Sequence, residues 1–133
     1  METELTSKEQ EFYTCLHRKL IFNNIGIKAK IPLANLCRER SDLLFNFGKD
    51  EKIISDVLID FVLYKKDKVV ACVEIFDEPD ELENRRGENL LKDLLLSRMG
   101  YEYFKVIDLD NIGKAAAIVK EKTLAALRNK AKQ

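Results

Sequence analysis

The chain has 133 residues, 46% of them hydrophobic, and its 23 basic and 23 acidic side chains give a formal net charge of zero. This size and apolar content predict a single domain over residues 1–133 with one buried core. Zero net charge excludes attraction of nucleic acid by the field of the whole molecule. No apolar run approaches the roughly 20 residues that cross a bilayer, and the three cysteines are far apart, so we expect a cytoplasmic protein with no membrane partner and no disulfide framework.

The first part of the chain predicts helical and extended elements in turn. Thr6 and Glu9 form a capping box, the pattern in which two side chains satisfy backbone N–H groups at the start of a helix. Apolar residues at helical spacing follow it, and apolar and basic residues then alternate as in a half-buried strand. The predicted elements are a helix over Ser7–Phe22, a strand over Ile25–Ile31, a short helical turn over Leu33–Arg40 and an irregular connection over 41–55.

The middle of the chain carries two lone carboxylates in apolar, β-branched runs. Asp60 lies in the run 57–63 and Glu74 in the run 69–76, and the polar stretch Lys65–Lys68 separates the two runs. This pattern predicts a β-hairpin with one acid on each strand. An ionised carboxylate in an apolar sheet costs several kcal/mol unless a cation or hydrogen-bond donors compensate it, so the pair predicts either a metal site or a structural ion-pair network.

The hairpin register decides whether the two acids can act together. Side chains alternate along a strand, so Asp60 and Glu74 share a face only if the sum of paired residue numbers is even. A loop of three or five residues meets this condition, and the Cβ atoms of a directly opposed pair would lie roughly 5 Å apart. A two-residue turn would instead send the acids to opposite faces.

The remainder of the chain predicts a helix, a strand and a final helix. Both hairpin faces are largely apolar, which is typical of a sheet covered on both sides. The predicted elements are an acidic loop over 77–84, a helix over Arg85–Met99 closed by Gly100, a strand over Tyr101–Ile107 and a helix over Ile112–Ala131. The expected order is therefore α-β-β-β-α-β-α, an α/β sandwich with a mixed central sheet and helices on both faces.

This arrangement resembles the PD-(D/E)XK nuclease superfamily, and more closely a bacterial branch of it known as a domain of unknown function. The resemblance rests on the segments Leu5–Tyr13, Asp60–Leu63, Val73–Asp77 and Lys92–Gly100, in this order. It implies a restriction-endonuclease-like fold. It also implies a metal-dependent nucleic-acid phosphodiesterase in which Asp60 and Glu74 hold Mg²⁺, and a lysine two residues after the second acid positions the attacking water.

The chain departs from the family pattern at the lysine position, which is Phe76. Phe can neither bind metal nor orient water. Arg85, Asn89, Lys92 and Leu96 fall on one strip of the following helix, and this strip flanks an expected apolar face of Leu90, Leu91, Leu94 and Leu95. We therefore expect Lys92 to replace the strand lysine and Arg85 to contact phosphate.

Other residues complete the predicted site, and the alternatives stay open. Asp77 directly follows the second strand and is a further candidate metal ligand, although an acidic loop is typically solvated. Lys28 and Lys30 are expected to point outward to solvent, where they could line a nucleic-acid groove. The alternative to an enzyme is a catalytically inactive module with the same fold that binds nucleic acid or a protein partner. An oligomerising structural domain is a third hypothesis.

Overall fold

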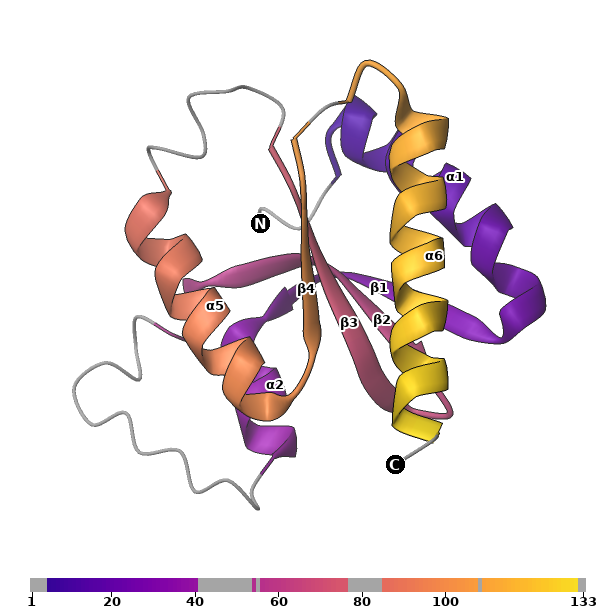
Figure 1. Ribbon diagram of the computed structural model, residues 1–133. Coiled ribbons are helices and arrows are strands. Elements are labelled where there is room, and N and C mark those ends of the chain that lie inside the picture. The colour runs from indigo at the N-terminus through magenta and orange to yellow at the C-terminus, as the bar shows by residue number, and fades with distance from the viewer. Residues whose placement is uncertain (1–4, 41–53, 55, 77–84, 108, 132–133) are drawn as a thin grey trace.

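The computed structural model describes residues 5–40, 54, 56–76, 85–107 and 109–131 (Figure 1). Its helices are α1 (Ser7–Leu20), α2 (Leu33–Glu39), α5 (Arg86–Met99) and α6 (Ile112–Ala131), with a short 3-10 helix η1 (Ile21–Asn23). Its strands are β1 (Ile25–Pro32), β2 (Leu58–Lys65), β3 (Lys68–Ile75) and β4 (Glu102–Val106). The predicted order of elements is confirmed. The acidic loop over 77–84 and most of the connection over 41–55 lie outside the described residues.

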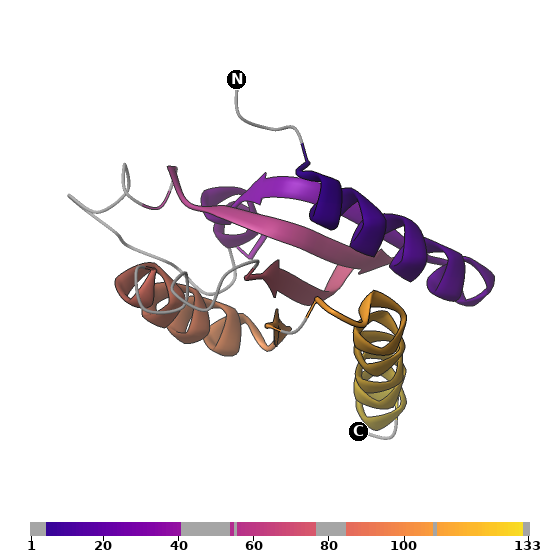
Figure 2. The ribbon, with the colours of Figure 1, turned by 90° about the horizontal axis from the view of Figure 1, so that it is seen from above.

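The four strands form one mixed sheet in the order β1-β2-β3-β4. The pairs β1–β2 and β2–β3 are antiparallel, whereas β3 and β4 are parallel. Parallel neighbours need a crossover connection, and α5 lies within it. Helices α2 and α5 cover one face of the sheet and α1 and α6 the other, as both views show (Figures 1 and 2). No described helix combines the length and apolar composition that a bilayer-spanning segment needs.

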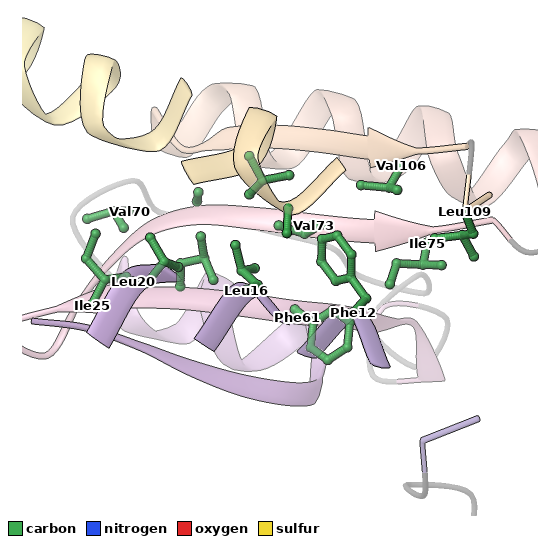
Figure 3. Close-up of a cluster of buried hydrophobic side chains, with 14 residues drawn as sticks. Phe12, Leu16, Leu20, Ile25, Phe61, Val70, Val73, Ile75, Val106 and Leu109 are labelled. Carbon is green, nitrogen blue, oxygen red and sulfur yellow. The ribbon is translucent and has the colours of Figure 1, made fainter. Parts of the chain in front are cut away.

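The core under α1 and α6 forms because α1 presents apolar residues one turn apart. Phe12, Leu16 and Leu20 are fully buried and pack against Phe61 and Val73 of the hairpin (Figure 3). Burying each such side chain contributes roughly 1.5–3 kcal/mol. The predicted capping box starts the helix, since the Thr6 Oγ1 accepts from the Glu9 N–H and Glu9 Oε1 accepts from the Thr6 N–H.

The hairpin turn has two residues, which is the shorter of the loop lengths that the parity condition distinguishes. Lys65 pairs with Lys68, and the intervening Lys66 and Asp67 have φ of 53° and 65°. Positive φ at both positions is the backbone of a tight turn that follows the twist of the strands. By the parity rule alone, this turn would place Asp60 and Glu74 on opposite faces of the sheet.

A β-bulge in β3 restores the shared face. On the turn side Tyr64 pairs with Val69, and on the far side Leu63 pairs with Ala71. Val70 is therefore an extra residue opposite β2, and it changes the sum of paired residue numbers from odd to even. Beyond the bulge Phe61 pairs with Val73. Asp60 and Glu74 are the next residues along the two strands, so in this register they are opposite each other and on the same face.

Helix α5 is rotated relative to the sequence-based expectation. Leu90 and Leu94 were expected on its buried face, but they are 62% and 68% exposed. The buried residues are instead Asn89, Lys92, Leu95, Leu96 and Met99. Lys92 donates to Glu74 of β3. The helical strip that contains Lys92, which was expected beside the apolar face, therefore faces the sheet. The predicted stop at Gly100 is confirmed, with φ of 79° and its N–H donating to helix carbonyls.

Candidate active site

Asp60 lies at the end of the backbone hydrogen-bond ladder between β2 and β3. Its carboxylate accepts a backbone N–H of β3 in place of a backbone carbonyl. Its Oδ2 accepts the Ile75 N–H at 2.8 Å, and its Oδ1 accepts from Lys30 Nζ at 3.0 Å. The side chain is buried, and burial alone would raise its pKa. Hydrogen bonds from Glu74 and Ile75, with the charge of Lys30, more than offset burial and hold the pKa of Asp60 below its ordinary value.

Lys30 does not point to solvent as expected. Its backbone is left-handed, with φ of 52°, and its neighbours Ala29 and Ile31 pair with the residues on either side of Asp60. The ammonium bridges Asp60 and Glu9, with a 2.7 Å contact to Glu9 Oε2, and only 15% of the side chain is exposed. Because Glu9 also closes the capping box, the start of α1 is tied to the acid pair.

Glu74 is fully buried and has three charged neighbours. Its Oε1 accepts from Lys92 Nζ at 2.5 Å, its Oε2 accepts from Arg85 at 3.0 Å, and it shares a hydrogen bond with Asp60. Burial and the charge of Asp60 raise the pKa of Glu74 to about 8, although Lys92 acts in the opposite direction. The two carboxyl groups are thus adjacent, as the register requires.

Both bases on Glu74 come from the α5 region, as the helical strip predicted. Lys92 has no exposed side-chain surface, whereas 27% of the Arg85 side chain is exposed. Arg85 also contacts Glu88 at 3.5 Å, and its guanidinium lies 4.9 Å from the ring centroid of Phe76. Phe76 is therefore a buried ring that supports the arginine.

The structure brings together Asp60, Glu74, Lys92, Arg85 and Lys30, but it does not bring Lys28 to them. The Lys28 ammonium lies 4.8 Å from the ring centroid of Tyr64, toward the hairpin turn. Asp77 lies outside the described residues. Sequence reasoning missed Glu9 as a member of the cluster, because the capping box already explained that residue; nothing local signals its second contact.

Oxygen atoms at the acid pair are of the kind that a hard cation prefers, although each already accepts a hydrogen bond from the protein. Within the described residues, no group of three or more His, Cys, Asp or Glu side chains lies close enough together to hold a metal ion. Mg²⁺ commonly uses only one or two carboxylates and keeps several waters, so two adjacent carboxyl groups are a sufficient donor set. A cation would compete with Lys30 for Asp60 and with Lys92 and Arg85 for Glu74.

A separate hollow of about 430 Å³ lies between β4 and α6. Its lining includes Lys114, Lys122, Ile107 and Ile118. Since α6 covers the sheet face opposite α5, this hollow does not contain the acid pair.

No protein-family model matches the chain, and neither the curated proteins nor the solved structures contain a match. The functional assignment therefore depends on the chemistry of the site.

Proposed function

We propose that this chain is a divalent-cation-dependent phosphodiesterase that acts on nucleic acid, with Asp60, Glu74 and Lys92 as its central residues. One observation carries the proposal: two buried carboxyl groups are adjacent on β2 and β3, and a buried lysine contacts one of them. Two adjacent acids repel each other when both are ionised, so this arrangement is suited to binding a cation.

The arrangement of elements also supports the proposal. The acids lie on β2 and β3, and a helix follows that leads into a parallel strand, as in the PD-(D/E)XK superfamily that the sequence resembles. We accordingly propose the restriction-endonuclease-like version of the α/β fold. The departure from the family pattern is Phe76, and Lys92 supplies a basic group from α5 in place of a strand lysine.

Each residue of the site then has a distinct task. Asp60 and Glu74 would hold the cation, which when bound supplies a more acidic water and positive charge beside the scissile phosphate. The Ile75 N–H and Lys30 fix the orientation of Asp60, and Lys92 fixes that of Glu74. Arg85 is the partly exposed base, so it exchanges Glu74 for a phosphate oxygen when substrate binds.

A catalytically inactive module is the second candidate, and the contact between Arg85 and Glu74 favours it. A guanidinium that stays on Glu74 would neutralise the carboxylate and keep a cation out. In that case the site would be a structural ion-pair network, and basic residues such as Lys28 would contact nucleic acid or a protein partner without cleavage.

Cleavage assays separate the two candidates. Labelled single-stranded and duplex DNA and RNA are incubated with the protein and Mg²⁺ or Mn²⁺. We expect cleavage by the wild type, and a loss of roughly 10²-fold or more in Asp60→Asn and Lys92→Met. Asp93→Asn is the matched control, because Asp93 is an exposed acid whose partner is Lys105. Binding without cleavage by the wild type would support the inactive module, and neither binding nor cleavage would refute both candidates.

A further inference from the structure

The inner strip of α5 contains a third polar residue, Asn89. It lies one turn after Arg85 and just under one turn before Lys92, and residues at these spacings are neighbours on a helix surface. Both flanking bases donate to Glu74. Asn89 therefore lies on the helix face that meets the acid pair.

Asn89 is 7% exposed, yet its Oδ1 has no hydrogen-bond partner within the part of the chain that the structure describes. Buried polar atoms in native proteins almost always have a partner, and an unsatisfied one costs about 1–3 kcal/mol. The amide oxygen is thus available to a bound group.

The charge of the cluster explains why an amide suits this position. Lys30, Arg85 and Lys92 face the three acids Glu9, Asp60 and Glu74. A further carboxylate on α5 would compete with Glu74 for Lys92 and Arg85. A neutral amide offers an oxygen without a formal charge, so it competes with Glu74 for these bases less strongly than a carboxylate would.

We infer that Asn89 Oδ1 supplies the third oxygen donor to the hydrated divalent cation held by Asp60 and Glu74. Amide oxygens and carboxylates are the protein ligands that hard divalent cations prefer, and water fills the remaining positions. The inference rests on the proposed function, because it adds a residue to the same cation site. It assigns Asn89 to cation binding and positioning and not to the bond-breaking step.

Calorimetric titration with Mn²⁺ tests the inference without any substrate. Asn89→Ala and Asn89→Leu both remove the oxygen, and the leucine variant nearly preserves side-chain volume. We expect each to bind Mn²⁺ about tenfold or more weakly than the wild type. Leu90→Ala is the matched control: this residue is adjacent on α5 but 62% exposed, so its binding of Mn²⁺ is expected to be unchanged.

Stability measured in chelator distinguishes a ligand from a structural residue. If Asn89 Oδ1 has no partner in the metal-free protein, Asn89→Leu leaves the free energy of unfolding unchanged or raises it. Wild-type affinity for Mn²⁺ in both Asn89 variants would overturn the inference while leaving the proposed function intact, and so would a clear loss of stability in chelator. Absence of Mn²⁺ binding by the wild type would overturn both.

Discussion

The Nζ atom of Lys92 lies 2.5 Å from Oε1 of Glu74, although 18 residues separate them in the chain, and neither side chain has exposed surface. Helix α5 brings them together by turning Lys92 inward and two leucines outward. A charged group in such a place depends on its partner, because water cannot replace it. The contact therefore joins the stability of the fold to the chemistry of the site.

Removing Glu74 should destabilise the protein more than removing both charges. Glu74→Ala leaves the Lys92 ammonium buried without its carboxylate, and we expect a loss of about 3–5 kcal/mol in the free energy of unfolding. The double variant Glu74→Leu with Lys92→Met keeps the volume apolar and should recover most of this loss. Urea denaturation monitored by circular dichroism measures both, and a loss below about 1 kcal/mol for Glu74→Ala would contradict the burial of this pair.

The raised pKa of Glu74 gives the free energy of unfolding a pH dependence of known sign. The pKa of Glu74 rises from 4.5 to about 8 on folding, so between these values the folded state binds more protons than the unfolded state. The contribution of Glu74 to the free energy of unfolding is therefore fully present below pH 4.5, and it is lost as the pH rises through about 8. In chelator, the stability of Glu74→Gln should depend less steeply on pH over this window, and equal slopes for variant and wild type would contradict the raised pKa of Glu74.

The contribution of Asp60 to stability changes with pH in the opposite direction, and it does so over a different range of pH. Its pKa is lowered from 3.8, so its contribution is lost only as the pH falls below that value. The comparison of Glu74→Gln with the wild type above this value therefore reports on Glu74.

The rotational setting of α5 can be tested with leucines on its two faces. Leu90 is 62% exposed and Leu95 is 6% exposed, although both were expected on the buried face. We expect Leu90→Ala to change the free energy of unfolding by no more than about 0.5 kcal/mol and Leu95→Ala to lower it by about 2–5 kcal/mol. Thermal or chemical denaturation gives both values. Equal losses in the two variants would mean that the strip with Lys92 does not face the sheet.

The order of elements could be predicted because each has a local signal. Thr6 and Glu9 begin α1 through a capping box, and Gly100 ends α5 in a left-handed conformation. The two acids were found because each interrupts an apolar run. Helical periodicity likewise placed Arg85 and Lys92 on one strip, since neighbours on a helix follow from spacing alone.

Tertiary contacts and a change of register could not be predicted in the same way. Nothing in the sequence around Val70 marks a bulge, yet this one extra residue places Glu74 on the face of Asp60. The leucines of α5 misled the prediction of its buried face because apolar pattern alone ignores the carboxylate that Lys92 must reach. Lys30 matched a solvent-facing strand position, but its ion pairs with Glu9 and Asp60 depend on distant parts of the chain.

Calorimetric titration of the wild type and of Asp60→Ala with Mg²⁺ and Mn²⁺ tests the central claim most directly. Asp93→Ala serves as the control acid, and circular dichroism verifies that each variant is folded. The account predicts that the wild type and Asp93→Ala bind the cation and that Asp60→Ala does not. Absence of binding in the wild type, or equal binding in Asp60→Ala, would contradict a cation site at Asp60 and Glu74.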